Sequence, residues 1–464
     1  MTYAIFGGGV SGLAAAFYLK SAGVKSKIIL FESSSHLGGW IRSCRNENGT
    51  LFELGPRTLR VAGNSGANSL HLAHSLNLEN EIKHVTSSHP SAKNRMIKVG
   101  NKLHKLPNNF KSALTKLPPF TKPLAFQILG DLKAPVVPSN DESFFSFAQR
   151  RFGIEVAKYA VDPFCRGIFA GNAKDLSVMA LSKSIYKAEQ KYGSVLKGLV
   201  FGRKSLFDSK DLTLNCSLVG RAKKEKWSVW SLEGGLSTLV NTLKSRIENS
   251  VEIHTNTKVQ EINSENDKIV IKTDDSIYTV DKVISCLPAF KLKDIVRSWN
   301  SPLFSLLKEI PYVSVGLVNL EYSGNIINEP GFGYLIPSCE SKTVLGVIYD
   351  SCIFPQGNKT VLTVMMGGYW FKEVFGDSPS ADTLLEIALQ EIRKTFNVNI
   401  DPINHKVTIL RNCIPQYTVG HHERVENIEH LLQGSNIYLG GNSFYGVGVN
   451  DAIYSTKKVV MSSL

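Results

Sequence analysis

The stretch Tyr3-Ala4-Ile5-Phe6-Gly7-Gly8-Gly9-Val10-Ser11-Gly12 stands at the start of the chain and decides its fold. A short apolar run of strand length leads directly into glycines with GxGxxG spacing. Gly7 permits a tight turn, Gly9 lets the backbone approach a pyrophosphate, and Gly12 lets the next helix pack closely on the strand. The residues that follow have helical composition as far as Ala22, and a helix N-terminus binds phosphate through its free N–H groups and its dipole. The stretch therefore predicts a strand, a turn and a helix that bind a dinucleotide.

An acidic residue stands where such a cradle needs one. Lys27–Phe31 reads as a second strand, and Glu32 follows Gly12 by twenty residues. A carboxylate at this distance accepts both hydroxyls of a ribose, with Ser33 beside it. Because a carboxylate would repel a 2′-phosphate, the pattern disfavours NADP.

A second glycine pair follows the acidic residue, in Leu37-Gly38-Gly39-Trp40-Ile41. A simple NAD-binding half-domain does not need it. The combination resembles the extended motif of the flavin-containing amine oxidase superfamily, which implies FAD. That superfamily usually has Arg or Lys two residues before the glycine pair, over the pyrophosphate. Here the position is His36, so this contact stays open.

Length and composition limit the class of protein. A chain of 464 residues exceeds one simple core and predicts two or three domains. The apolar content of 43% and the charged content of 20% are typical of a folded globular chain. The first strand begins within three residues of Met1, so we expect no cleavable presequence, and no apolar run reaches the length of a membrane-spanning helix. The seven cysteines lack CxxC spacing, which predicts no metal site and no disulfide framework.

The net charge of +13 lies in one part of the chain. Residues 91–205 hold 20 Lys and Arg against 7 Asp and Glu, which accounts for the whole excess. This quarter reads as short helices that interleave lysines with Phe and Leu. We expect it to lie on an anionic membrane surface, with apolar side chains among the headgroups. Nucleic-acid binding lacks any accompanying motif, and a soluble basic helical domain remains a third interpretation.

The remaining chain divides around this insertion. We expect a discontinuous α/β, Rossmann-like FAD-binding domain of the glutathione-reductase type, a mixed-sheet substrate domain and the helical membrane-binding insertion. A series of strands between residues 251 and 286 is expected to extend the FAD-domain sheet. The predicted bounds are 1–85, 206–295 and 411–464 for the FAD-binding domain, 86–107 and 296–410 for the substrate domain, and 108–205 for the insertion.

The closing segment supplies a second half of the cradle. Asn436–Gly441 is a strand that runs into glycines, and Gly446–Asn450 opens a last helix. We expect the N-terminus of that helix to face the flavin and to stabilise the negative charge of its reduced form. The superfamily often has an acidic residue where Asn442 stands, so contacts to the ribitol stay open.

Several motifs spread along the chain resemble one family, the protoporphyrinogen oxidases. The resemblance covers essentially the whole chain in order, and its central and C-terminal motifs are more specific than the glycine turn. The motifs are Gly55-Pro56-Arg57, Asn94-Arg95, Phe164–Gly171, Gly331–Pro337, Cys413–Tyr417 and Gly446–Asp451.

The resemblance implies a reaction and residues that carry it. The family removes six electrons from protoporphyrinogen IX in three flavin cycles, gives protoporphyrin IX, and passes the electrons to oxygen as hydrogen peroxide. In family terms the catalytic positions are Arg57, near the flavin ring, and Met365, near the flavin face. The substrate positions are Arg95 for a propionate, Phe332 and Leu335 around the pyrrole rings, and Gly167 in the pocket lining. As alternatives, Arg57 is a surface or salt-bridging arginine, Arg95 is a surface arginine, and Phe332, Leu335 and Met365 are strand core.

The cradle and the resemblance together predict the contacts to FAD. The monoamine oxidases of the same superfamily bind FAD covalently through a cysteine near the last segment. No cysteine follows Cys413 here, so the resemblance implies that FAD is non-covalent. The predicted cofactor-binding residues are Gly7, Gly9, Ser11, Gly12, Glu32, Ser33, Gly38, Gly39, Trp40, Gly55, Pro56, Arg57, Val259, Asn442, Val447 and Val449.

Partners, location and competing functions rest on the resemblance alone. It implies monotopic attachment to the mitochondrial inner membrane, and it suggests homodimer formation and transfer of product to ferrochelatase as further hypotheses. The competing functions are another superfamily amine oxidase or polyene desaturase, and a non-catalytic binding protein similar to GDP-dissociation inhibitors.

Overall fold

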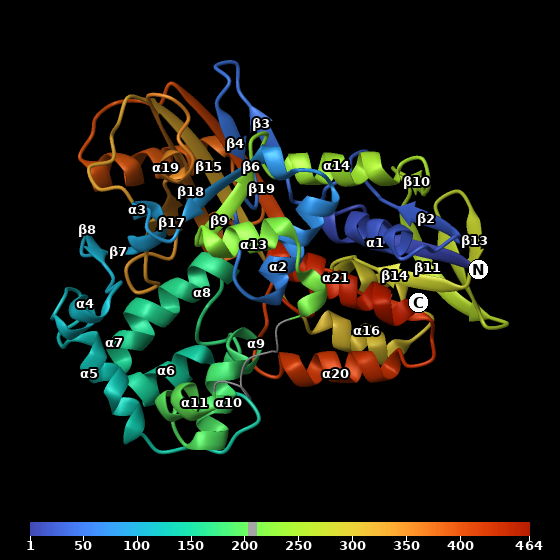
Figure 1. Cartoon of the computed structure of the whole chain (residues 1–464), viewed down its shortest axis with the longest axis horizontal. Helices are drawn as coiled ribbons and strands as arrows, with labels where there is room; N and C mark the ends of the chain where they lie inside the picture. Colours follow the sequence, from blue (N-terminus) through green and yellow to red (C-terminus); the bar gives the residue numbers. More distant parts are fainter. Residues whose placement is uncertain (203–210) are drawn as a thin grey trace.

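A five-stranded parallel sheet forms around the first strand of the chain. The computed structural model describes residues 1–202 and 211–464, and in it both ends of the chain reach this sheet (Figure 1). The strand that carries the glycine turn lies at its centre. The sheet order is β10 (Glu252–His254), β2 (Lys27–Phe31), β1 (Thr2–Phe6), β14 (Lys282–Ser285) and β20 (Ile437–Leu439).

Alternate residues of β1 enter two different cores. Tyr3 and Ile5 pack with α1 (Val10–Ser21), α14 (Ser237–Ile247) and α21 (Val449–Ser463). Ala4 and Phe6 enter a second core on the opposite face, since successive strand side chains point to opposite sides. The helices of that second core are α15 (Ala289–Ile295), α16 (Ser301–Lys308) and α20 (His421–Leu431). Helix α16 therefore packs with the nucleotide-binding region, although it lies beyond the predicted edge at residue 295.

The strands between residues 259 and 280 do not extend the parallel sheet, so that prediction is wrong. β11 (Val259–Glu265), β12 (Lys268–Thr273) and β13 (Ile277–Val280) form a separate antiparallel sheet. Asn266 and Asp267, which join the first two, both have positive φ, as a two-residue hairpin turn requires. A hairpin gives antiparallel pairing, whereas a parallel extension needs a crossover connection. Only β10 and β14 of the predicted series join the parallel sheet.

A seven-stranded mixed sheet forms the second region. One neighbouring pair, β16 and β7, is parallel, and the other pairs are antiparallel. β19 crosses the predicted domain edge at residue 410. The order is β19 (Asn404–Pro415), β15 (Tyr312–Ser323), β18 (Lys359–Gly368), β17 (Val344–Ile348), β16 (Gly333–Leu335), β7 (Met96–Val99) and β8 (Lys102–Lys105).

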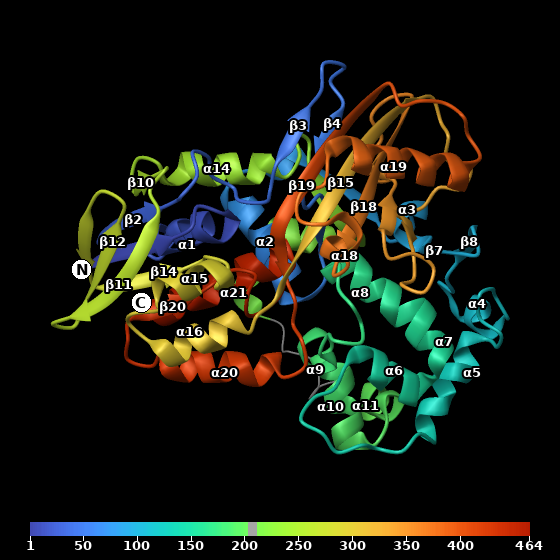
Figure 2. The same cartoon turned by 180° about the vertical axis from the view of Figure 1, so that it is seen from behind.

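The two faces of this sheet differ in what they meet. Helix α19 (Ala381–Phe396) lies beside β15 and β18 (Figures 1 and 2), and Leu362 and Val364 of β18 enter its apolar core. Thr363 and Met365, which alternate with them along the strand, point to the opposite face. That face meets the nucleotide-binding region through the hairpin of β3 (Ser43–Arg45) and β4 (Leu51–Glu53).

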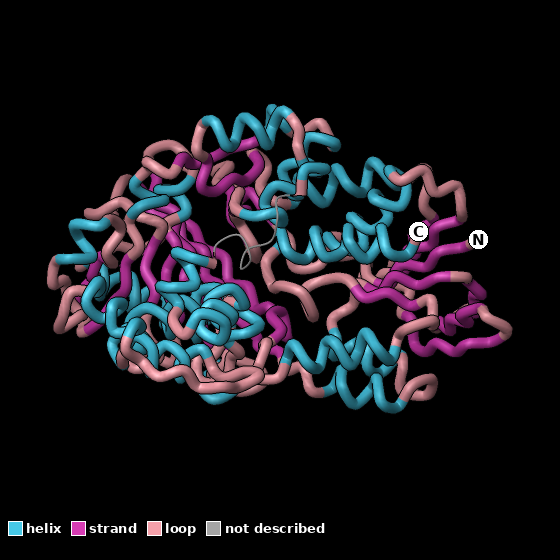
Figure 3. The backbone as a smooth tube through the Cα atoms, turned by 60° about the horizontal axis from the view of Figure 1, so that its bottom comes forward, coloured by secondary structure: helices cyan, strands magenta, loops and turns pink. Residues whose placement is uncertain are grey.

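The basic quarter folds as a cluster of helices with its own core. Figure 3 shows it apart from the helices that flank the parallel sheet. Within it the buried guanidinium of Arg151 donates to the carboxylate of Asp131 over 2.6 Å. Its larger helices are α4 (Phe110–Leu114), α5 (Leu124–Leu129), α6 (Phe144–Phe152), α8 (Asp162–Phe169), α10 (Lys183–Tyr192) and α11 (Val195–Phe201). The predicted domain edge between residues 205 and 206 lies outside the described residues. Among the helices that the structure describes, none has both the length and the apolarity to span a bilayer.

Candidate active site

The glycine turn has the geometry that a dinucleotide cradle requires. Gly7 has a φ of +94°, and a Cβ on Gly12 would lie 1.8 Å from the carbonyl oxygen of Gly7. Only glycine fits there, because that contact is with backbone and cannot move aside. Helix α1 begins after Gly9 without a side-chain cap, and Ser11 is buried in its first turn. Its first N–H groups therefore remain available to a phosphate.

The second glycine pair packs directly on the first. The N–H of Gly38 donates to the carbonyl of Gly8 over 2.8 Å, and Gly9 and Gly38 form a parallel bridge. A Cβ on Gly39 would lie 3.3 Å from the Cα of Gly9. The two glycine segments thus form one surface made largely of backbone, which lets an extended ligand approach closely.

Glu32 binds the cradle itself in this structure. One carboxylate oxygen accepts from the N–H of Gly8 over 2.7 Å, and the other accepts from the N–H and hydroxyl of Ser34 over 2.8 Å each. The Ser33 hydroxyl lies 3.5 Å from the same carboxylate and is exposed. Val259 lies at the start of β11, just past Thr257, whose N–H donates to the Glu32 carbonyl. Glu32, Ser33 and Val259 thus lie close together at one edge of the cradle.

Sequence reasoning missed a cation at the His36 position. The guanidinium of Arg42 contacts the His36 imidazole across the loop that carries Gly38 and Gly39. A positive charge therefore stands next to the glycine pair although position 36 is not Lys or Arg. Arg42 lies four residues after Gly38, and no general spacing rule points to it.

The C-terminal half of the cradle is held by a buried tyrosine. The hydroxyl of Tyr417 accepts from the N–H of Gly446 over 2.9 Å and donates to the carbonyl of Asn442. The Asn442 amide donates to the Cys413 carbonyl over 3.4 Å, while Val447 is half-buried just before α21. This network fixes the turn that leads into the last helix.

The start of α21 differs from the expected anion site in one respect. Val449 is its first residue, and Gly448 before it provides no side-chain cap. Asp451 folds back beneath the turn and accepts from the N–H of Gly448 and from Ser65, and burial raises the pKa of its carboxyl. The Asp451 carboxyl thus uses part of the positive potential of this N-terminus, which sequence spacing did not reveal.

The segment Gly55-Pro56-Arg57, here called the strap, lies against the backbone that follows the second glycine pair. A Cβ on Gly55 would lie 2.1 Å from the carbonyl oxygen of Trp40, so the strap runs tightly against that backbone. Arg57 is buried, and its guanidinium binds the Asp350 carboxylate over 2.7 Å. The surface alternative for Arg57 is therefore wrong, and the salt-bridging alternative describes its contact.

The four predicted substrate residues form two touching pairs. The guanidinium of Arg95 stacks over the Phe332 ring at 4.5 Å, and burial, with Arg60 nearby, lowers its pKa. A Cβ on Gly167 would lie 2.8 Å from a methyl carbon of Leu335. The glycine therefore leaves room for the leucine. Arg95 is half-buried rather than a surface arginine.

Strand pairing brings the two pairs onto one face of the mixed sheet. Leu335 lies opposite Ile97, so Leu335 and Arg95, two residues before Ile97, share a face. Leu335, Phe332 and Met365 are half-buried, whereas Tyr334 and Met366 beside them are fully buried against α19. Met365 and Trp40 both pack against a small apolar cluster that includes Leu317. The partial burial of Leu335, Phe332 and Met365 differs from the full burial of strand core residues. It favours the interpretation that these side chains line a binding site.

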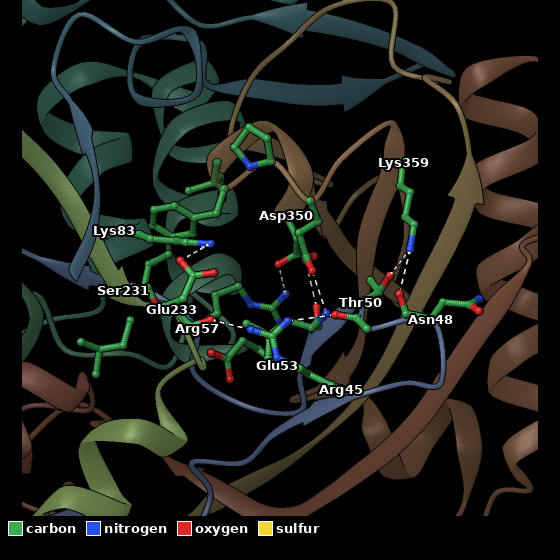
Figure 4. A pocket seen from close by; sticks show the side chains of 18 residues that line it. Arg45, Asn48, Thr50, Glu53, Arg57, Lys83, Ser231, Glu233, Asp350 and Lys359 are labelled. Carbon is green, nitrogen blue, oxygen red and sulfur yellow. Dashed lines mark hydrogen bonds and ion pairs between the residues drawn. The ribbon is translucent and has the colours of Figure 1, made fainter. Parts of the chain in front are cut away.

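A polar cavity of about 230 Å³ opens beside the strap (Figure 4). Arg57 and Asp350 point toward one another within it, between the pairs Lys83–Glu233 and Lys359–Thr50. Glu53 also lines it and accepts from the N–H of Leu236 over 2.8 Å and from the Ser43 hydroxyl over 2.6 Å. Burial raises the pKa of the Glu53 carboxyl to about 7, against the opposing effect of these hydrogen bonds and of Arg57.

Metal-ligating side chains and the last cysteine of the chain were the remaining candidates for cofactor contacts. Across residues 1–202 and 211–464, no three His, Cys, Asp or Glu side chains gather in a geometry for a metal ion. Cys413, the last cysteine, is buried, and burial raises its pKa to about 12.

Comparison with known proteins accounts for this arrangement. Residues 10–461 match the family model described as flavin containing amine oxidoreductase. The chain is 39% identical to protoporphyrinogen oxidase of Bos taurus, over 98% of this chain and 97% of the relative. It is 38% identical to the human enzyme of that name, over 100% and 98%. The chain belongs to the protoporphyrinogen oxidase family.

The family relationship and the geometry agree on the cofactor. A solved structure from Exiguobacterium, provisionally assigned as a protoporphyrinogen oxidase, matches with a TM-score of 0.79 over 99% of this chain and 98% of its own. At 22% identity it supports the fold alone. This family is flavin-dependent, so the chain is an FAD oxidoreductase. The uncapped start of α1 and the paired glycine backbones fit the pyrophosphate of FAD.

Proposed function

We propose that this chain oxidises protoporphyrinogen IX to protoporphyrin IX, with oxygen as the final electron acceptor. The observation that carries the proposal is the face of the mixed sheet that gathers Arg95, Phe332, Leu335 and Gly167 close to the strap and Met365. It combines a half-buried cation with apolar side chains. A porphyrinogen has the matching chemistry, since it carries propionates on an apolar macrocycle.

The reaction removes six electrons in three rounds, which gives three molecules of hydrogen peroxide. FAD supplies the acceptor for two electrons in each round. The protein contributes position rather than a strong base, because this type of oxidation depends on holding the reacting carbon against the cofactor.

The residues of the site then have separate roles. Arg95 binds a propionate through a charge-assisted hydrogen bond. Phe332 fixes the Arg95 guanidinium by stacking and, with Leu335, presents an apolar surface to the macrocycle. Gly167 leaves space beside Leu335, and Met365 forms the apolar wall nearest to Trp40.

The test is an assay of porphyrin fluorescence with purified, FAD-loaded protein in air. We expect protoporphyrin to form with three molecules of peroxide for each molecule of product. Coproporphyrinogen III, which carries two more propionates, is the matched comparison and should react more slowly. No porphyrin from either compound, or faster turnover of coproporphyrinogen, would overturn the assignment.

We propose in addition that FAD is non-covalent. The support is that Cys413 is the last cysteine and is buried with its sulfur against the Val313 carbonyl. Acid precipitation should leave all flavin in the supernatant. Yellow colour that stays with the precipitated protein would contradict the proposal.

The helical cluster is proposed to attach the protein to an anionic membrane surface. Phe110 is 80% exposed, Phe126 60% and Phe201 78%, which is unusual for aromatic side chains. Exposed lysines lie in the same segments, among them Lys111 and Lys122. Aromatic side chains within a basic surface are typical of interfacial membrane binding.

Flotation with liposomes tests the membrane proposal. Binding should need anionic lipid, weaken with salt, and fall when Phe110 and Phe126 are both replaced by Ser. Ile277→Ser is the matched control, because Ile277 is 70% exposed but lies in the β11–β13 sheet. Equal loss with the control, or no binding at low salt, would overturn the proposal.

The remaining partners are proposals that rest on family resemblance. Peripheral attachment to the mitochondrial inner membrane is checked by carbonate extraction of fractionated organelles. A homodimer predicts twice the chain mass in sedimentation experiments. Transfer of product to ferrochelatase predicts that added free porphyrin competes poorly with porphyrin formed in place.

A further inference from the structure

A chain of buried polar contacts links the strap to the mixed sheet. The guanidinium of Arg57 binds one carboxylate oxygen of Asp350 over 2.7 Å. The hydroxyl of Thr363 donates to the other oxygen of that carboxylate over 2.7 Å. The amide of Asn319 donates to the Thr363 oxygen, also over 2.7 Å. Both carboxylate oxygens of Asp350 therefore accept a hydrogen bond, one from Thr363 on the sheet side and one from Arg57 of the strap.

Asn319 also contacts the chain just before the strap. Asn319 and Thr363 are direct partners across β15 and β18, so their positions are fixed by the sheet ladder. The Asn319 amide also donates to the main-chain carbonyl of Glu53 over 3.2 Å, two residues before Gly55. The sheet therefore contacts the chain on both sides of the Gly55-Pro56 turn.

This polar chain lies beside the reacting part of the site. Thr363 is two residues before Met365 on the same face of β18, and Asn319 is two residues after Leu317 on β15. Leu317 and Met365 belong to the apolar cluster that includes Trp40, whose carbonyl abuts Gly55. A shift of the strap would consequently change its position relative to Trp40 and Met365.

We infer that Asp350 is a positioning residue of the FAD site. It fixes the Arg57 guanidinium, and Thr363 and Asn319 fix Asp350 in turn. Through these contacts the substrate-bearing sheet sets the position of the strap over the cradle. Hydrogen bonds of defined geometry, and not only apolar packing, therefore fix the position of the two regions relative to each other.

A second ion pair, beside the cavity, joins the same two regions at a different point. Lys359 binds Glu321 over 2.9 Å, and the Glu321 carboxylate accepts from Thr50 of the β3–β4 hairpin over 2.8 Å. This pair also joins the sheet to the nucleotide-binding region, but it reaches the hairpin and not the strap. It serves as a control for general effects on the contact between the two regions.

The experiment compares three near-isosteric variants of the FAD-loaded protein. Asp350→Asn removes the charge that holds Arg57. Glu321→Gln changes the hairpin contact, and Glu391→Gln changes an ion pair on the α19 face of the sheet. The readouts are the Kd of apoprotein for FAD, the visible circular dichroism of bound flavin, and kcat and KM taken separately.

For Asp350→Asn we expect an FAD Kd and a kcat that are each worse by about tenfold or more, the scale of one lost charge-assisted contact. The flavin dichroism should change, and KM should stay within about threefold because Arg95 is untouched. Glu321→Gln and Glu391→Gln should leave the dichroism and kcat unchanged. Thr363→Val, which keeps the ion pair and loses only the hydroxyl, should show the same changes in smaller size.

Two results would overturn the inference. One is an Asp350→Asn protein with the wild-type flavin dichroism, Kd and kcat. The other is the same change in dichroism from Glu321→Gln or Glu391→Gln, which would show a general effect of weakened packing. If Asp350→Asn does not fold, Thr363→Val alone decides, and normal dichroism and kcat in that variant would reject the role.

Discussion

Two buried ion pairs lie on opposite faces of the same sheet. Lys98–Glu391 and Arg57–Asp350 both have an N–O distance of 2.7 Å. The side chains of the first are 7% and 12% exposed, and those of the second are 8% and 16% exposed. By distance, burial and chemistry the two pairs are nearly the same.

They differ in what they connect. Lys98 and Glu391 join β7 to α19 within one region, and the Tyr334 hydroxyl and Thr395 complete the group. Arg57 and Asp350 join two regions and touch the strap beside the FAD cradle. The comparison teaches that burial and distance do not distinguish a stabilising ion pair from a positioning one. The role of an ion pair depends on which segments of the chain it joins.

The largest effect is expected from breaking the α19 pair. Lys98→Ala leaves the Glu391 carboxylate buried without its cation, which costs about 3–5 kcal/mol of unfolding free energy. Urea denaturation measures the loss. The folded fraction should keep wild-type flavin content and KM, and a change in either would break the distinction between the two pairs.

A pH dependence should arise beside the Arg57–Asp350 pair. Burial raises the pKa of Glu53 to about 7, whereas an unfolded Glu titrates near about 4.3. The folded state therefore holds this proton more tightly, so the stabilisation is complete below the unfolded pKa and is lost as the pH rises through about 7. Across this window wild type should lose on the order of 3 kcal/mol relative to Glu53→Gln.

The Arg57–Asp350 pair should affect the pH range over which this stability is lost. The Asp350 carboxylate raises the Glu53 pKa, so Asp350→Asn should narrow the window, while Glu391→Gln should leave it unchanged. Thermal denaturation at a series of pH values checks both statements. An identical pH profile for wild type and Glu53→Gln would disprove the titration.

The next comparison is between two cations that are close in sequence, Arg95 just before β7 and Lys98 within it. Arg95 and Lys98 lie on opposite faces, because Met96 packs toward α19 and Ile97 does not. Arg95→Ala should raise KM by about 10- to 150-fold through loss of a charge-assisted hydrogen bond, with little change in stability. Steady-state kinetics with protoporphyrinogen measure it. Lys98→Ala should show the reverse pattern, and an unchanged KM in Arg95→Ala would refute the propionate role.

The smallest effect is expected at Gly167. A Cβ there would lie 2.8 Å from the Leu335 side chain, which is flexible enough to shift. Gly167→Ala should lower kcat/KM by about tenfold or less, because a small displacement of a wall residue costs on the order of 1 kcal/mol. Gly220→Ala is the control, since a Cβ at Gly220 meets nothing within 4 Å. Equal losses in both variants would remove Leu335 from the site.

The cradle could be predicted from sequence because its determinants are local. Gly7, Gly9 and Gly12 follow from spacing, and Glu32 from its distance to them. The strands at 259–280 were assigned to the wrong sheet, because a run of apolar residues predicts a strand without naming its partner. The positive φ at Asn266 and Asp267 decided that partner.

The positioning chain could not be predicted in the same way. Arg57 and Asp350 are 293 residues apart, and neither residue type is unusual for its segment. β18 is buried on both of its faces, and Leu362, Thr363 and Val364 are all fully buried. Its nearly continuous apolar sequence therefore has no alternation that would assign Thr363 and Met365 to one face.

The pairing of β20 with β14 has a consequence for how the protein is made. β1 and the glycine turn are synthesised long before β20 and α21, which lie within residues 437–463 and complete the same region. The site gains these elements only after they have left the ribosome. We therefore expect flavin capture to follow their synthesis, as a late event of biogenesis.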